Sequence, residues 1–243
     1  MSETSATLGT EARDAEPSVR LVLASASPRR RQLLSLMGLS FQMIAADVDE
    51  TMRLGELPVE LARRLSAAKA GKVCISHPQT LIIAADTLVV LDGDILGKPA
   101  HAAMAEEMLT RLRGRYHLVY TGLALVDSAH RRCCQQVAIT PVLMRHYSAE
   151  EIQRYVASGD PLDKAGAYAI QYAGFDPVAR FEGCYANVMG LPMCHLYRAL
   201  QAWDVSIPVH PLDCCPYAVA QSGCSWSSDI TQSPLSAICR RPS

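Results

Sequence analysis

Residues 21–38 read LVLASASPRRRQLLSLMG, and they predict a strand, a small-residue loop and a helix in succession. The apolar run 21–23 is typical of a short buried strand. Ser27 is expected as the N-cap, Pro28 takes the first helical position, and Gly38 follows the last apolar turn, so both ends of the helix are marked. A strand that leads through a short loop into a helix favours an α/β fold.

Apolar runs alternate with helical patterns from this stretch to about Val209, which predicts one α/β domain over residues 19–209. Residues 1–18 are rich in Ser, Thr, Glu and Ala without apolar periodicity, and we expect a flexible N-terminal tail. Residues 210–243 are rich in Pro, Cys, Ser and Gln, and we expect an irregular C-terminal tail.

The composition is that of an ordinary globular protein, with 49% hydrophobic and 19% charged residues and a net charge of −1 over 243 residues. Without a basic block, a nucleic acid polymer is a poor candidate partner. No run approaches the roughly 20 apolar residues that span a bilayer, and the polar start differs from a secretory signal. We therefore expect a cytoplasmic protein with no membrane partner. The nine cysteines contain no Cys-x-x-Cys pair, so no zinc site is predicted.

Three cations, Arg29, Arg30 and Arg31, open the helix that begins at Pro28. A helix N-terminus presents unpaired N–H groups and a partial positive charge, so these side chains oppose the helix dipole. An anionic ligand would relieve this cost. The residues alone leave two interpretations open, an anion site and a solvated basic helix start.

Two acidic features follow predicted strands. A strand over 41–46 leads into an acidic loop that contains Glu50, and such loops are often merely solvated. Asp86 follows the apolar run 81–85, where a carboxylate costs several kcal/mol unless it is paired, protonated or bound to metal. Asp86 is therefore the residue that packing explains least.

Further elements are expected downstream. The patterns predict a hairpin turn at 92–93, helices over 102–113, 148–156 and 192–203, and strands over 119–126 and 136–144. Residues 159–171 are expected to form a polar loop that enters a strand.

The charged candidates together fit a nucleoside triphosphate ligand. Carboxylates can hold Mg²⁺ and orient a water, and cations can neutralise charge that develops on phosphate oxygens. The candidates are the acids Glu50 and Asp86, the lysines Lys69 and Lys98, and the arginines Arg29 and Arg30.

A series of short runs stands in order between about residues 20 and 205. They are LASASPRR at 23–30, DET at 49–51, ADT at 85–87, GKP at 97–99, YV at 155–156, PLDKAGAY at 161–168 and NVMGLP at 187–192. As a set, they resemble the Maf family of nucleotide pyrophosphatases. The resemblance implies a two-lobed Maf/ITPase-like α/β fold, in which a long mixed sheet is flanked by helices and a cleft lies between the lobes.

The resemblance also implies an activity, which is hydrolysis of a nucleoside triphosphate between its α and β phosphates with a divalent metal. Mg²⁺ is the first choice, with Mn²⁺ and Co²⁺ as alternatives. Asp86 matches the family's proposed general base and Glu50 its second acid, and both would hold the metal. Lys69 and Lys98 match catalytic lysines. Whether Asp86 takes a proton from water or mainly binds the metal is left open.

The same resemblance assigns substrate contacts to Ser25, Ser27, Arg29, Arg30, Thr87 and Gln171. Arg29, Thr87 and Gln171 match the branch that acts on dTTP and UTP in the house-cleaning of nucleotide pools. An amide at position 171 can both donate to and accept from a uracil or thymine edge. Tyr172 replaces the glycine that is usual after this glutamine.

Two alternatives remain beside this interpretation. One is the 7-methyl-GTP branch of the same family, and the other is a non-catalytic nucleotide-binding regulator of cell division. A small-molecule nucleotide is the partner in each case, and a homodimer is a further prediction.

Overall fold

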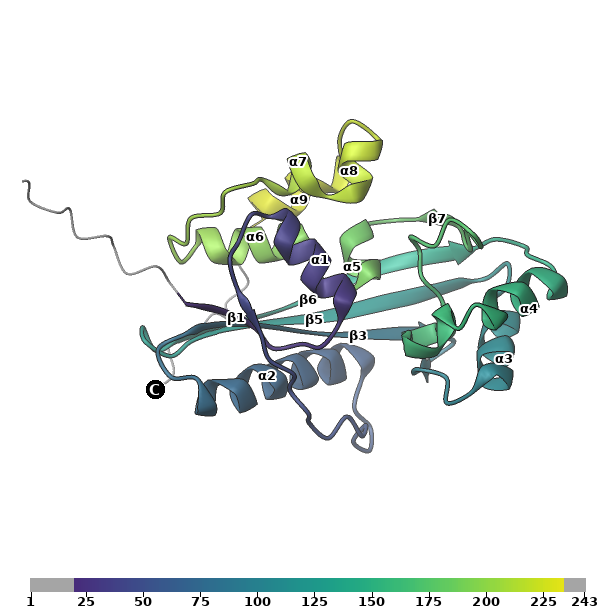
Figure 1. Ribbon diagram of the computed structural model, residues 1–243, viewed down its shortest axis with the longest axis horizontal. Helices are drawn as coiled ribbons and strands as arrows, with labels where there is room; N and C mark the ends of the chain where they lie inside the picture. Colours follow the sequence, from purple (N-terminus) through teal and green to yellow (C-terminus); the bar gives the residue numbers. More distant parts are fainter. Residues whose placement is uncertain (1–19, 234–243) are drawn as a thin grey trace, which may run out of the picture.

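The protein, described here over residues 20–233 by a computed structural model, is built on a mixed sheet with strand order β2-β1-β3-β5-β6-β7 and with β4 paired to β3 (Figure 1). β1 runs parallel to β2 and β3, and the other pairs are antiparallel. The strands are β1 (Leu21–Leu23), β2 (Gln42–Met43), β3 (Leu81–Leu91), β4 (Asp94–Leu96), β5 (Tyr116–Asp127), β6 (Arg132–Met144) and β7 (Val178–Phe181). The predicted tail over 1–18 lies outside the described residues.

Helices cover both faces of the sheet. α2 lies on one face, while α1, α6 and the C-terminal helices lie on the other (Figure 1). The helices are α1 (Pro28–Leu36), α2 (Pro58–Ser76), α3 (Ala102–Leu112), α4 (Ala149–Ala157), α5 (Tyr185–Met189), α6 (Met193–Gln201), α7 (Pro211–Cys214), α8 (Pro216–Ala220) and α9 (Ser225–Gln232), with 3-10 turns η1 (Asp160–Asp163) and η2 (Ala165–Ala167). Within residues 20–233, no helix combines the length and the apolar character that a bilayer crossing needs.

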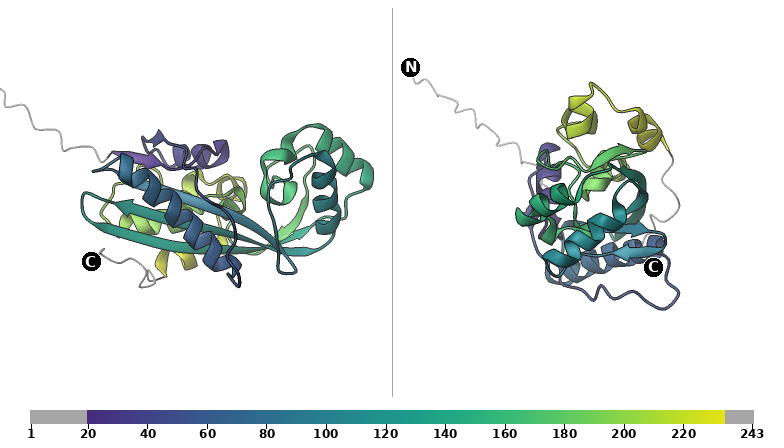
Figure 2. Two further views of the ribbon diagram at one scale, coloured as in Figure 1. Left: turned by 90° about the horizontal axis from the view of Figure 1, so that it is seen from below. Right: turned by 90° about the vertical axis from the view of Figure 1, so that its right-hand side faces the viewer.

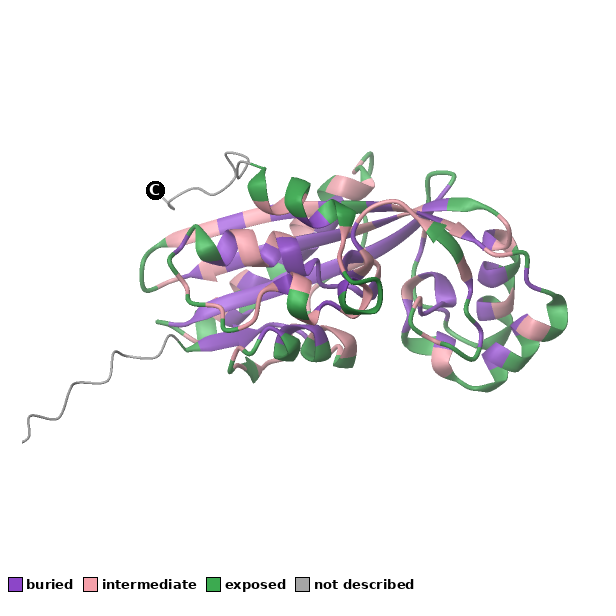
Figure 3. Ribbon diagram, turned by 90° about the horizontal axis from the view of Figure 1, so that it is seen from above, coloured by how far each residue is buried: buried purple, intermediate pink, exposed green. Residues whose placement is uncertain are grey.

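The molecule has two lobes, which confirms the predicted fold. α3, α4 and the 3-10 turns form the smaller lobe, and the long strands β3, β5 and β6 run through both lobes (Figure 2). Each lobe has its own buried apolar cluster, represented by Leu33 and Leu196 in the larger lobe and by Leu109 and Tyr147 in the smaller. Buried residues follow the strands from one lobe into the other (Figure 3).

Side chains along β3 alternate between the two faces of the sheet. Ile83 and Ala85 belong to the core beneath α1 and α6, whereas Ile82 and Ala84 pack with α2. Because successive residues of a strand point to opposite faces, Asp86 points towards α2. Thr87, one residue later, points towards α1.

One edge of β3 is paired only at its two ends. β1 pairs with residues 81–83 and β4 with residues 89–91, so among the described strands none pairs with 84–88 at this edge. The sheet therefore has a gap between β1 and β4. Asp86 and Thr87 lie in the gap, one on each face.

Gly122 allows α2 to approach the sheet beside this gap. It is the register partner of Asp86 on β5, and a Cβ built on it would lie 2.0 Å from the carbonyl oxygen of Ala62 in α2. Contact distances of this kind exclude any side chain, so only glycine lets the helix backbone lie here. The close approach brings Lys69, two turns further along α2, down to the level of Asp86.

The first helix begins as the sequence predicts. The backbone N–H of Arg30 donates to Ser27 Oγ at 3.4 Å, Pro28 is the first helical residue, and Gly38 has a φ of 74° just after the C-cap. The hairpin at 92–93 and the predicted helices and long strands are also present, with ends that differ by a few residues.

The irregular C-terminal tail is a wrong prediction for residues 210–233. This segment forms α7, α8 and α9, and Cys215 and Ala218 are buried in the core of the larger lobe. Arg198 of α6 donates to the carbonyl oxygen of Ile230 at 2.9 Å. The segment is therefore part of the domain, and the domain extends past the predicted end at residue 209. Residues 234–243 lie outside the described chain.

Two strand predictions are also wrong. The strand expected over 41–46 is reduced to β2, which spans Gln42–Met43. The loop at 159–171 enters the two 3-10 turns instead of a strand, and β7 begins only at Val178. Gly166 has a φ of 67°, and a Cβ there would lie 2.8 Å from Val89, so packing against β3 shapes this loop.

We predict that Gly122→Ala destabilises the fold, because the new methyl group meets the backbone of α2. Overpacking of this kind costs about 1–3 kcal/mol. The matched control is Gly71→Ala within α2, where a Cβ meets nothing within 4 Å and alanine should stabilise the helix by about 0.5–1 kcal/mol. Urea unfolding of both variants checks this, and equal stability of the two would contradict it.

Candidate active site

A pocket of about 440 Å³ lies at the open edge of β3, between the two lobes. Nine of the ten predicted site residues line it: Ser25, Ser27, Arg29, Arg30, Glu50, Lys69, Thr87, Lys98 and Gln171. Asp86 is the exception, because it lies behind Lys69 on the α2 face. The structure thus brings together residues from α1, α2, β3 and four loops that are far apart in sequence.

Lys69 joins the two predicted acids. Its Nζ lies 2.5 Å from Asp86 Oδ1 and 2.7 Å from Glu50 Oε1. The Asp86 side chain is 8% exposed and that of Lys69 is 11% exposed, whereas the Glu50 side chain is 62% exposed. The carboxylate that packing left unexplained is therefore paired with a buried lysine, which offsets the cost of its burial.

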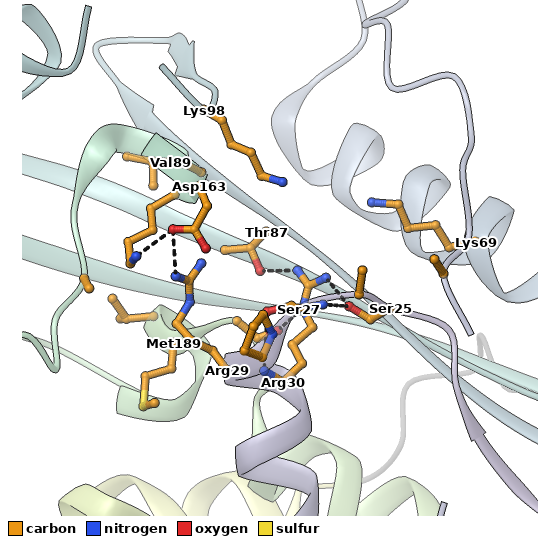
Figure 4. A pocket seen from close by; sticks show the side chains of 18 of the residues that line it. Ser25, Ser27, Arg29, Arg30, Lys69, Thr87, Val89, Lys98, Asp163 and Met189 are labelled. Atoms are coloured by element: carbon orange, nitrogen blue, oxygen red, sulfur yellow. Dashed lines mark hydrogen bonds and ion pairs between the residues drawn. The ribbon is translucent and has the colours of Figure 1, made fainter. Parts of the chain in front are cut away.

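Arg30 is fixed by three hydrogen bonds on the opposite face of the gap (Figure 4). Its Nε donates to the Gly190 carbonyl oxygen at 2.8 Å, Nη1 to Ser25 Oγ at 3.3 Å, and Nη2 to Thr87 Oγ1 at 3.0 Å. The planar guanidinium presents its donors in a rigid fork, so these acceptors set both the place and the plane of the group.

Two threonines, of which Thr121 is fully buried, support this arginine from behind. Thr87 Oγ1 lies 3.0 Å from Thr121 Oγ1, and Thr121 donates to the carbonyl oxygen of Asn187 at 3.1 Å. Burial lowers the pKa of Arg30, and the nearby negative charge of Asp86 offsets only part of this effect. An arginine stays protonated in spite of such shifts, so the pocket keeps this cation.

Arg29 faces the smaller lobe. Its Nη1 lies 3.8 Å from Asp163 Oδ1, and Lys164 donates to the same carboxylate oxygen at 2.6 Å (Figure 4). Desolvation raises the pKa of Asp163, but Lys164 and Arg29 outweigh this and hold it below its usual value. Residues from both lobes thus meet across the pocket.

Lys98 and Gln171 are exposed and have no hydrogen bond or ion pair with any residue in the described part of the chain. The amine of Lys98 points into the space that also receives Arg30 and Lys69 (Figure 4). Gln171 lies in the loop after η2. Both groups are therefore available to a ligand.

Positive charge exceeds negative charge along the pocket wall. The lining cations are Arg29, Arg30, Lys69, Lys98 and Lys164, and the lining acids are Asp47, Glu50 and Asp163. The N-terminus of α1 adds its partial positive charge at the same place. A polyanion fits this arrangement better than a neutral or cationic ligand does.

Asp86 and Glu50 have the donor chemistry that Mg²⁺ prefers. In the described part of the chain, no residue donates a hydrogen bond to Asp86 Oδ2 or Glu50 Oε2, so these oxygens can serve as ligands. No group of three or more His, Cys, Asp and Glu side chains able to hold a metal occurs over residues 20–233. Two carboxylates completed by substrate phosphates are a common Mg²⁺ arrangement, so the residues fit such an ion.

Sequence reasoning missed several residues that shape the site. Asp163, Lys164 and Tyr168 line the pocket, and Thr121 and Asn187 support Arg30 from within the core. The first three fall within the run PLDKAGAY, which was noted only as a motif. Asn187 opens the run NVMGLP, which is also one of the motifs. For Thr121 no local sequence signal exists, because its contact with Thr87 joins positions 34 residues apart.

The two lobes and the cation-rich cleft beside two carboxylates define an α/β protein whose pocket has the charge and shape to suit a phosphorylated ligand. The family model for Maf-like proteins matches residues 20–203. The chain therefore belongs to the Maf-like family, as the sequence motifs predicted.

Relatives with named activities share most of the chain. A dTTP/UTP pyrophosphatase of Syntrophus aciditrophicus is 44% identical over 182 residues, which are 75% of this chain and 89% of the relative. A dTTP/UTP pyrophosphatase of Myxococcus xanthus is 47% identical over 188 residues, which are 77% and 94% of the two chains. A solved HAM1 protein from Coxiella burnetii is 18% identical, with a TM-score of 0.36 and coverage of 53% of this chain and 74% of its own.

We predict that Lys69→Met destabilises the protein at neutral pH without divalent metal, because it leaves the Asp86 carboxylate buried and unpaired. Breaking a buried ion pair in this way costs about 3–5 kcal/mol. Lys72→Met on the exposed side of α2 is the control and should cost less than about 1 kcal/mol. Urea unfolding of both variants in EDTA measures the two losses of stability. Similar losses would show that the pair of Lys69 and Asp86 contributes no more to stability than an exposed lysine does.

Proposed function

We propose that this chain is a nucleoside triphosphate pyrophosphatase that hydrolyses dTTP and UTP to the monophosphate and pyrophosphate. The observation that carries the proposal is Lys69, which holds Asp86 and Glu50 together at the edge of a pocket rich in cations. The named activity of relatives that are 44% and 47% identical supports it.

In this proposal the two faces of the gap in the sheet have separate tasks. On the α1 face, Arg30 and the helix N-terminus bind the phosphates, and Lys98 reaches them from the smaller lobe. On the α2 face, Asp86 and Glu50 act on the water. The water oxygen bonds to the α phosphorus, the bond from that phosphorus to the bridging oxygen breaks, and pyrophosphate leaves. The proton of the water passes to a carboxylate, for which we propose Asp86.

We further propose Mg²⁺ as the cofactor, held by Asp86 and Glu50, with Mn²⁺ or Co²⁺ as replacements. Such an ion, when bound, polarises phosphate oxygens and neutralises their charge. Lys69 stays beside both carboxylates and keeps them in place. A cytoplasmic location and a homodimer remain predictions.

Base recognition is proposed for Arg29 and Gln171, which line the pocket on the side of the smaller lobe. The free amide of Gln171 can donate to a ring carbonyl and accept from the N3–H of uracil or thymine. Thr87 was predicted in the same group, but its hydroxyl is engaged by Arg30 and Thr121. We therefore propose that Thr87 acts on selectivity through the placement of Arg30.

We predict that the purified protein converts UTP to UMP and pyrophosphate, and that Asp86→Asn and Glu50→Gln each lower kcat at least about 10²-fold. Each variant removes a charge needed at the water or the metal. The control is Asp92→Asn, at an exposed ion pair with Arg115, which should keep kcat. Chromatography of the products and measured turnover check this.

Three results would contradict the assignment. Release of UDP and orthophosphate would mean attack at the γ phosphate. Turnover near that of the unmodified protein in Asp86→Asn or Glu50→Gln would remove that acid from the mechanism. Nucleotide binding without any hydrolysis would favour the non-catalytic regulator.

We predict that Gln171→Glu lowers kcat/KM for dTTP and UTP about 5- to 150-fold, which corresponds to the loss of roughly 1–3 kcal/mol from one well-placed hydrogen bond. The carboxylate cannot donate and faces a neutral base, whereas it suits the cationic base of 7-methyl-GTP. Activity on 7-methyl-GTP should fall less or rise. Gln201→Glu, on the exposed side of α6, is the control. An unchanged ratio between the substrates would exclude Gln171 from base selection.

A further inference from the structure

The loop that carries Glu50 has no regular structure of its own. Residues 44–57 contain neither a helix nor a strand, and the Glu50 side chain is 62% exposed. Such a segment samples many conformations unless other contacts restrict it. A carboxylate needed at a defined place in the site therefore depends on what holds this loop.

α2 supplies three cations to this loop. Arg64 contacts the loop at Thr51 and Glu56, Lys69 contacts Glu50, and Lys72 donates to the carbonyl oxygen of Asp47. The loop runs beside α2 before it turns into the first residue of that helix (Figure 1). Of the three, only Lys69 lines the pocket. Arg64 precedes Lys69 on α2, and Lys72 follows it.

Arg64 makes the most extensive of these contacts. Its Nε donates to Glu56 Oε1 at 2.6 Å, and its Nη2 donates to Glu56 Oε2 at 2.8 Å and to the carbonyl oxygen of Thr51 at 2.9 Å. Glu56 Oε2 also accepts from the backbone N–H of Arg53 at 3.0 Å. Bidentate pairs of this kind fix geometry as well as add energy.

The pair of Arg64 and Glu56 is ionised at neutral pH. The hydrogen bonds from Arg64, together with that from the Arg53 backbone, lower the pKa of Glu56 to about 2. The Glu56 side chain is only 9% exposed, so water and salt compete weakly for it.

We propose that Arg64, paired with Glu56, is a positioning residue that fixes Glu50 relative to Lys69 and Asp86. Thr51, whose carbonyl oxygen Arg64 holds, follows Glu50 directly in the chain. Arg64 and Lys69 lie on one rigid helix, so a contact from Arg64 to residue 51 fixes residue 50 relative to Lys69. The catalytic part of this inference rests on the role proposed above for Glu50.

Arg64 does not line the pocket. Substitution of Arg64 is therefore expected to change the Mg²⁺ requirement and kcat, and to leave the affinity for the nucleotide unchanged. This separates a positioning role from a contact with substrate.

The test is Arg64→Lys, which keeps the charge and the aliphatic stem but loses the fork. We expect kcat on UTP to fall about 10- to 100-fold, because small displacements of a catalytic group have effects of this size. The Mg²⁺ concentration for half-maximal activity should rise about 10-fold, with KM for UTP within about 2-fold. Glu56→Gln should show the same pattern more weakly.

Arg111→Lys is the matched control, since Arg111 also pairs with a carboxylate, that of Asp94, at 2.6 Å but lies on α3 in the smaller lobe. It should leave kcat, KM and the Mg²⁺ requirement unchanged. A rise in KM for Arg64→Lys with unchanged kcat would overturn the proposal, because that pattern indicates loss of substrate binding.

Hydrogen exchange of the loop amides gives a readout without nucleotide or metal. The amide of Arg53, which donates to Glu56, should exchange at least about 10-fold faster in Arg64→Lys and at the original rate in Arg111→Lys. Unchanged exchange overturns the proposal whether or not the protein hydrolyses UTP. If Arg64→Lys shows faster exchange but keeps the kcat and the Mg²⁺ requirement of the unmodified enzyme, the proposal is also overturned. Absence of UTP hydrolysis in the unmodified protein contradicts the proposed function. The exchange rate then decides by itself whether the pair of Arg64 and Glu56 fixes the loop.

Discussion

The alternation of side chains along β3 determines how the whole pocket is organised. Asp86 and Thr87 are neighbours in sequence, yet the pleat sends one to each face of the sheet. No strand within residues 20–233 pairs with the edge of β3 at this point, so groups from both faces reach the same opening. Acids and Lys69 approach from the side of α2, and arginines approach from the side of α1.

Each polar group of the site depends on a partner that a neighbouring helix or strand brings into contact with it. Asp86 is stable in the sheet because Lys69 pairs with it, and Lys69 reaches it because α2 lies directly on Gly122. On the other face, Arg30 is held through Thr87 and Thr121 by the backbone of Asn187. Buried polar groups that satisfy one another in this way specify one packing of helix on sheet.

Local signals made part of this predictable from sequence. Ser27, Pro28 and Gly38 marked the first helix, and Asp86 drew attention because an apolar strand gives a carboxylate no partner. The contact between Arg30 and Thr87 joins residues 57 positions apart, so no local pattern encodes it. The C-terminal helices were missed because α7 and α8 have four and five residues, too few to show a helical period.

The continuity of β3, β5 and β6 through both lobes also limits how the cleft can move. A hinge needs a few residues that absorb a large change in backbone angles, but the residues between these lobes are held in ladders of hydrogen bonds. Relative motion of the lobes is therefore a torsion spread along the shared strands. The floor of the cleft keeps its width under this torsion, and the displacement accumulates at the rim, where Arg29 and Asp163 face each other.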